Sequence, residues 1–120
     1  MNGKECDRTI KRSVLEREIR IRITDTGNGI NVLIDGGDKS HIGAVAAASP
    51  DSELQVIVFP GHREDVICRR WAEEIVKKYN GPVVVEAGIH YNQIKKTELQ
   101  ELLAILEEQL QAFLSLLEKE

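Results

Sequence analysis

The alternating pattern between residues 13 and 24 restricts the fold of this chain more than any other feature. Apolar and polar side chains follow each other with a period of two, and Arg17 is the exception on the apolar side. This period predicts a long strand that is buried on one face only. Asp25–Gly29 follows, and its Asn-Gly pair tolerates positive φ at both positions, which is typical of a tight hairpin. The returning strand is residues 30–34, which stops at Gly36-Gly37. The apolar positions of the first strand are Leu15, Ile19, Ile21 and Ile23.

Three further segments have the composition of strands. Residues 41–48 are small and apolar, and a turn by composition follows at residues 49–52. Residues 53–59 indicate a buried strand that Pro60 stops, and Val83-Val84-Val85 begins another strand that leads to residues 87–91. The first four strands are joined by short connections, so the sequence predicts a mainly antiparallel sheet, a four-strand meander plus a fifth strand.

Two helices complete the predicted α+β fold. The first runs from about residue 63 to residue 79 and ends at Asn80-Gly81-Pro82. The second opens on the capping-box pattern Thr97–Gln100 and continues to the end of the chain. It can pack on its own sheet or on a partner's copy, and these two arrangements can coexist. The predicted buried stripe of the first helix is Val66, Ile67, Trp71, Ile75 and Val76, and the leucine seam of the second is Leu99, Leu103, Leu106, Leu110, Phe113 and Leu117.

Length and charge narrow the class of protein. A chain of 120 residues fits one domain, here residues 13–120, preceded by a polar and flexible tail at residues 1–12. A net charge of −4 argues against a nucleic-acid binder. Residues 1–8 show no apolar leader, no apolar run is long enough for a membrane span, and the two cysteines form no disulfide or metal pattern. We therefore expect a soluble, cytoplasmic protein.

The segment Gly36–Gly43 is the first of three polar clusters at the ends of predicted elements. Its paired glycines permit a sharp turn or an anion-binding nest of backbone N–H groups. Asp38, Lys39 and His41 add a carboxylate, an ammonium and an imidazole within four positions. A plain hairpin loop with solvated charges explains the same residues.

The second cluster, residues 60–65, lies at the start of the first predicted helix. Free N–H groups and the helix dipole favour a phosphate there, with His62 and Arg63 as further donors. Arg70 lies one or two turns from Arg63 on a similar face. Glu64 and Asp65 can instead cap the helix themselves, which would leave no place for an anion.

The third cluster is Gly88-Ile89-His90-Tyr91, after the fifth strand. His90 and Tyr91 supply rings for stacking and groups for hydrogen bonds. A structural histidine at a strand end is the simpler explanation. The spacing of His41, His62 and His90 matches no zinc pattern, so no metal site is expected.

The three clusters together resemble a known family. Gly36–Val45, Gly61–Val66 and Ala87–Tyr91 look like the motifs of the prenylated-flavin chaperones, the LpdD-like proteins associated with UbiD-type decarboxylases. The resemblance covers nearly the whole chain. It implies a fold similar to that of proteasome-assembly chaperones, with a sheet, helices and a homodimer.

The function that this resemblance implies is a non-catalytic binder of prenylated FMN, or of FMN. It would assist delivery of the cofactor to a UbiD-type decarboxylase or maturation of that enzyme, with a flavin prenyltransferase as a further partner. The phosphate would lie on Gly36-Gly37 or on the start of the first helix. The residues expected at the cofactor are Gly36, Gly37, Asp38, Lys39, His41, Gly43, Gly61, His62, Arg63, Arg70, Gly88, His90 and Tyr91.

Two other classes of protein remain open. One is an assembly or scaffold protein that acts through the C-terminal helix without a cofactor. The other is a decarboxylase accessory subunit that uses its histidines as acid and base.

Overall fold

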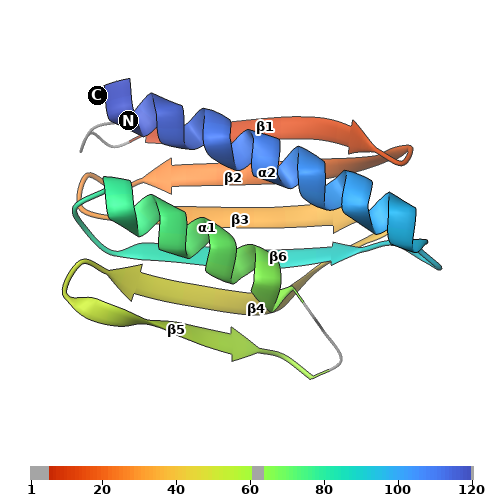
Figure 1. The fold of residues 1–120 in the computed structure, drawn as a ribbon, viewed down its shortest axis with the longest axis horizontal. Coiled ribbons are helices and arrows are strands. Elements are labelled where there is room, and N and C mark those ends of the chain that lie inside the picture. Colours follow the sequence, from red (N-terminus) through yellow and green to blue (C-terminus); the bar gives the residue numbers. More distant parts are fainter. Residues whose placement is uncertain (1–5, 61–63, 120) are drawn as a thin grey trace.

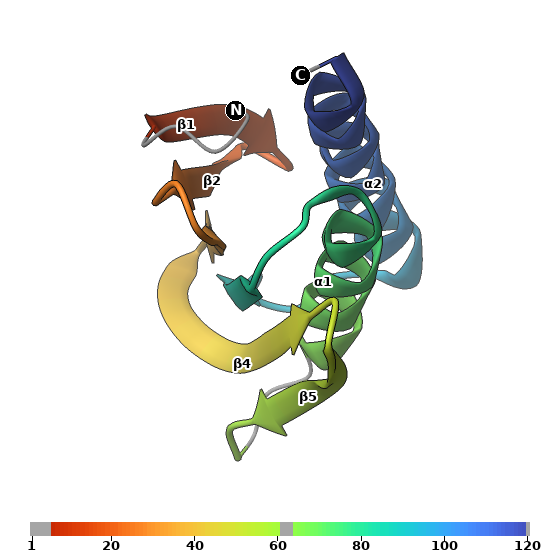
Figure 2. The same cartoon turned by 90° about the vertical axis from the view of Figure 1, so that its left-hand side faces the viewer.

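A sheet of six strands carries two helices on one of its faces (Figures 1 and 2). The computed structural model describes residues 6–60 and 64–119. The strand order is β1-β2-β3-β6-β4-β5, and each neighbouring pair is antiparallel except β3 and β6, which are parallel. The strands are β1 (Cys6–Val14), β2 (Arg17–Asp25), β3 (Ile30–Gly37), β4 (Lys39–Ser49), β5 (Ser52–Val58) and β6 (Val83–His90), and the helices are α1 (Asp65–Lys78) and α2 (Lys96–Lys119). The predicted α+β class is therefore confirmed.

The predicted four-strand meander is wrong, because β6 lies between β3 and β4. Strands β5 and β6 lie on either side of β4 and both run antiparallel to it, so they are parallel to each other. Helix α1 therefore connects them as a crossover over one face of the sheet. The central position suits β6 because Val83, Val85 and Ala87 are fully buried. A meander follows from the rule that consecutive strands usually pair, and β3 and β4 break that rule.

The N-terminal residues form a strand where the sequence predicts a tail up to residue 12. Cys6–Val14 pairs along its length with β2, while residues 1–5 lie outside the described part. The two strands are joined at Leu15 and Glu16, whose φ values of +53° and +64° are those of a tight two-residue hairpin. The strand predicted to begin at residue 13 is thus two strands. Edge strands tolerate charged side chains, so the polarity of β1 does not mark it as disordered.

Helix α2 packs on its own sheet, as one of the two predicted arrangements requires. Leu106, Leu110 and Phe113 of the predicted seam are buried in the core. The first turns differ, because Leu99 and Leu103 are 42% and 37% exposed. In the part of the chain that the structure describes, no helix is long and apolar enough to cross a membrane.

Strand β5 and the start of α1 are more exposed than the sequence predicts. β5 forms the outer edge of the sheet, and Ile57, Val58 and Phe59 beside it are 61%, 44% and 41% exposed. Val66 in α1 is 62% exposed, and Cys68 occupies the buried position instead. A buried strand and an exposed edge strand can have the same apolar composition, so the pattern alone does not separate them.

Candidate functional site

Two of the three predicted clusters meet where β3 passes into β4. Gly37 and Lys39 both pair with His90 of β6, and the Asp38 N–H donates to the His90 carbonyl at 2.7 Å. Gly37 has a φ of +85°, and a Cβ there would lie 2.3 Å from the His90 oxygen. The glycine is required for this crossing, because any larger residue would separate the strands. The first cluster is therefore a junction between strands rather than the hairpin loop considered above.

Gly88 allows a second close approach in the same region. The register between β4 and β6 shifts between Ser40 and Ala44, which leaves His41 and its neighbours in a bulge. A Cβ on Gly88 would lie 1.6 Å from the His41 carbonyl oxygen. The first and third clusters are thus in direct backbone contact, although 47 positions separate His41 from Gly88 in the numbering.

Asp38 anchors the loops around this junction. Its carboxylate accepts hydrogen bonds from the Arg17 Nε at 2.5 Å and from the backbone N–H of Asn92 at 2.8 Å. Both hydrogen bonds hold the pKa of Asp38 below its ordinary value, and the bond from Asn92 has the larger effect. Asp38 is therefore ionised, and both of its oxygens already have protein partners.

His41 connects the junction to the start of α1. Its Nε2 lies 2.8 Å from the Glu64 carboxylate, and both side chains are largely shielded from solvent. Glu64 is at the helix N-cap position but makes no side-chain cap bond, so it does not play the capping role weighed above. The His41 and His90 rings face each other edge-on, with centroids 6.4 Å apart. We call Asp38, His41, Glu64 and His90 the junction cluster.

The other predicted site residues have different positions. Gly61, His62 and Arg63 lie outside the described residues. Arg70 pairs with Glu107 of α2 at 2.9 Å and with Glu74 of its own helix. Gly36, with a φ of +140°, lies against the backbone of β2. The Gly43 carbonyl accepts a hydrogen bond from the Phe59 N–H. The Tyr91 hydroxyl donates to the Val14 carbonyl at 2.6 Å.

The open space beside the junction cluster is small. A cavity of about 130 Å³ is bordered by Arg17, Asp38, Tyr91, Asn92 and Glu98, among others. Pockets for drug-sized ligands usually have volumes of roughly 300–1,000 Å³. Arg17 and Asn92 are not among the residues that the sequence predicts for this region. The exceptional position of Arg17 on an apolar face was the one signal for it.

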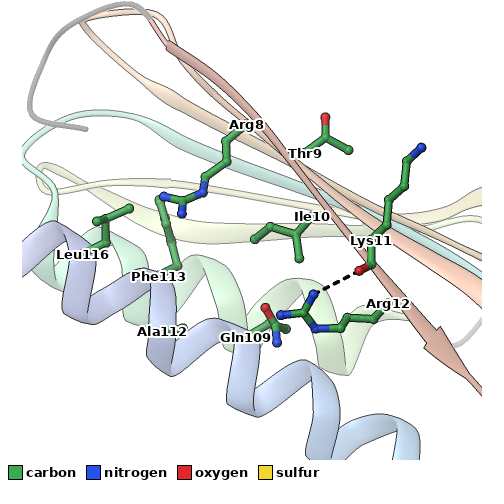
Figure 3. A pocket seen from close by; sticks show the side chains of 9 residues that line it. All are labelled: Arg8, Thr9, Ile10, Lys11, Arg12, Gln109, Ala112, Phe113 and Leu116. Atoms are coloured by element: carbon green, nitrogen blue, oxygen red, sulfur yellow. Dashed lines mark hydrogen bonds between the residues drawn. The ribbon is translucent and has the colours of Figure 1, made fainter.

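A larger cavity of about 430 Å³ lies between β1 and α2, away from all three clusters (Figure 3). We call it the β1–α2 groove. Arg8, Ile10 and Arg12 come from the strand, and Gln109 and Phe113 come from the helix. The sequence pattern does not indicate this groove, because it predicts a flexible tail for residues 1–12 and so no strand opposite the helix.

The fold of this chain has a counterpart among solved structures. It superposes on a structure described as a novel chaperone complex for yeast 20S proteasome assembly with a TM-score of 0.61, covering 95% of this chain and 97% of that one. The identity is 18%, so this likeness concerns the fold alone.

Residues 13–118 match the model of the prenylated flavin chaperone LpdD-like domain, and the chain belongs to this family. It is also 30% identical over 78 residues to Protein LpdD of Lactiplantibacillus plantarum. That match covers 61% of this chain and 57% of the relative, so it spans little more than half of the relative's length. The resemblance drawn from the three clusters is confirmed. Membership of this family supports a non-catalytic chaperone role connected with prenylated flavin.

Proposed function

We propose that this chain binds prenylated FMN in the cytoplasm and assists its delivery to a UbiD-type decarboxylase, or the maturation of that enzyme. The observation that carries the proposal is the meeting of the first and third family-like motifs at the junction cluster. Family membership supports the role, and the cluster supplies two imidazole rings and two carboxylates at one rim of the sheet, with the Lys39 ammonium on the adjacent residue.

The geometry limits how the flavin would lie there. The backbones of Gly36 and Gly37 pair with β2 and β6, so they offer little of the predicted phosphate nest. Lys39 is exposed and forms no ion pair among the described residues, which leaves its ammonium for the phosphate. The adjoining cavity of about 130 Å³ is too small to enclose the ring system. We therefore expect the flavin to lie across the rim, in contact with His41 and His90.

Co-expression with a flavin prenyltransferase tests this function. The protein is purified without added cofactor, and its absorbance spectrum and native mass are recorded. A flavin absorbance band and a mass increase of one prenylated FMN per chain are expected. A colourless protein without this adduct, and without FMN binding by calorimetry, would refute the proposal.

A pair of lysine variants places the ligand. Lys39→Ala is expected to reduce flavin occupancy at least about fivefold, because one cation beside a phosphate contributes about 1 kcal/mol. Lys77→Ala is the matched control, since Lys77 is also exposed but pairs with Glu74 in α1. Equal occupancy in both variants would show that the flavin does not lie at the junction cluster.

A second candidate is the assembly protein that acts through α2 without a cofactor. The observation in its favour is an apolar patch formed by the exposed side chains of Val66, Leu99 and Leu103. A neighbouring hollow of about 160 Å³ between α1 and α2 reaches Trp71. Leu103→Glu is expected to abolish decarboxylase binding in this case, while His41→Ala and His90→Ala leave it intact. If the chain is a flavin carrier instead, His41→Ala and His90→Ala should reduce cofactor transfer, and Leu103→Glu should leave it intact.

The expected homodimer is also part of this proposal. Edge strand β5 carries a single charged residue, Glu53, and exposes Ile57 and Val58. An apolar edge of this kind is a template for pairing with another strand. We expect light scattering to give twice the chain mass, and Ile57→Lys to give the mass of one chain.

A further inference from the structure

The β1–α2 groove combines positive charge with an apolar floor. Figure 3 shows the side chains of Arg8, Ile10 and Arg12 directed from β1 toward α2, while Thr9 and Lys11 point away from the helix. Phe113 and Leu116 form the opposite wall, and Phe113 is only 3% exposed. No acidic side chain lines the groove within the described part of the chain. Its volume of about 430 Å³ is within the range of small-molecule sites.

Three polar side chains of the groove, Arg8, Arg12 and Gln109, make few bonds to the described residues. Arg8 and Arg12 form no ion pair among residues 6–60 and 64–119, and Arg12 only donates to the neighbouring Lys11 carbonyl at 3.1 Å. Gln109 is 7% exposed, and its amide makes no hydrogen bond to any described residue. The amide atoms of Gln109 are not among the fully buried unpaired atoms of the described residues, so they face the open groove. These three side chains are therefore available for a group that residues 6–60 and 64–119 do not supply.

We propose that the β1–α2 groove binds a small organic anion, in which one carboxylate or phosphate is carried on an apolar body. The anionic head would lie between Arg8 and Arg12, since guanidinium groups bind both heads through paired hydrogen bonds. The apolar body would pack on Phe113, and the Gln109 amide would hydrogen-bond a polar atom at the junction of the two parts.

This site is separate from the junction cluster and does not depend on the flavin role. Gln109 lies eleven residues beyond Glu98, which borders the small cavity, in the same helix. At roughly 1.5 Å per residue, this spacing corresponds to about 16 Å along the helix axis. One small ligand therefore does not occupy both places.

An aromatic sulfonate dye, anilinonaphthalene sulfonate, tests the proposal because it has the same two parts. Its fluorescence should rise with one dye bound per chain. The variant Arg8→Gln/Arg12→Gln should weaken binding at least about tenfold, and Gln109→Leu about threefold. Neutral phenylnaphthylamine, which lacks the sulfonate, should bind all three proteins equally. A variant with both arginines replaced that binds the dye like wild type would overturn the proposal.

Control variants and competitors determine which site and which head group are involved. His41→Ala should bind the dye like wild type, and weaker binding would assign the dye to the junction cluster and refute the groove. FMN and decanoate compete in separate titrations, so displacement by one of them identifies a phosphate or a carboxylate ligand. The proposed ligand class is wrong if neither FMN nor decanoate displaces the dye. It is also wrong if inorganic phosphate, which has no apolar body, displaces the dye as effectively as they do. If the double arginine change alters the oligomeric state in light scattering, the groove is an interface instead.

Discussion

The junction cluster and the β1–α2 groove are both polar regions at the surface of one sheet, but their polar groups are used differently. In the junction cluster, Asp38 and His41 bond to groups from β2, from the loop after β6 and from the start of α1. In the groove, Arg8 and Gln109 bond to no described residue.

The contrast shows that a recognisable sequence motif and a group of side chains available for hydrogen bonds need not occur at the same place. The junction cluster follows from glycine-rich segments that the sequence makes obvious, and much of its polarity stabilises the fold. The groove has no motif, yet its Arg8 and Gln109 side chains bond to none of the described residues. Changes in the junction cluster should therefore reduce stability, whereas changes in the groove should alter ligand binding with little loss of stability.

Gly88→Ala should have the largest effect. Its new methyl group would lie 1.6 Å from the His41 carbonyl oxygen, so β4 and β6 must separate. We expect a loss of about 3 kcal/mol or more in urea unfolding. Gly29→Ala is the control, because its methyl group would approach no atom closer than 3.4 Å. Equal stability of the two variants would contradict the close packing at the junction.

His41→Ala should have the next largest effect. It removes the 2.8 Å bond to Glu64 in a region largely shielded from solvent, with an expected loss of about 1–3 kcal/mol. His90→Ala should change the unfolding free energy by less than about 0.5 kcal/mol, since His90 is exposed and, among the described residues, its ring hydrogen-bonds to the nearby Asn92 alone. The comparison fails if the His90 variant is the less stable of the two.

Gln109→Leu should have a small effect of opposite sign. It replaces a largely buried residue, whose amide bonds to no described residue, by an apolar side chain, so stability should stay equal or rise by up to about 1 kcal/mol. Gln111→Leu is the control, because Gln111 is exposed and donates to Glu107 at 2.8 Å. A clear loss of stability in the Gln109 variant would mean that its amide is satisfied within the chain.

Asp38→Asn should give the smallest effect, and one that depends on pH. Because the folded pKa of Asp38 is below the ordinary value of 3.8, its ionised form stabilises the fold above that pH. This contribution is lost as pH falls through the folded pKa. The melting temperatures of wild type and variant should therefore differ at about pH 6 and converge at low pH. A difference that persists in acid would exclude the carboxylate charge as its source.

Local features of the fold could be predicted because neighbouring residues encode them. The turn predicted after Asp25 is observed, with the Thr26 N–H donating to the Gly29 carbonyl at 3.0 Å, although the positive φ lies at Gly27 and not at the Asn28-Gly29 pair. The helix from Lys96 likewise follows from its own periodicity. Both predictions rest on contacts within a few residues along the chain, where propensity and spacing act directly.

Features that depend on distant residues could not be predicted. The residues Val83–His90 contain no local signal that this strand lies between β3 and β4, because any two strands can pair through their backbone edges. The contact between Gly88 and His41 depends on that placement, and the family resemblance alone brought the two motifs together. Gln109 reads as an ordinary polar residue of a helix until β1 is placed beside it.

The central position of β6 has a consequence for the order in which the chain acquires its structure. Strands β1, β2 and β3 can pair as soon as they are synthesised, and so can β4 and β5, because each pairing is local. The two halves have no joining strand until residues 83–90 leave the ribosome. Until then the nascent chain presents two unpaired inner edges at β3 and β4, which are the places where aggregation or holdase binding would begin.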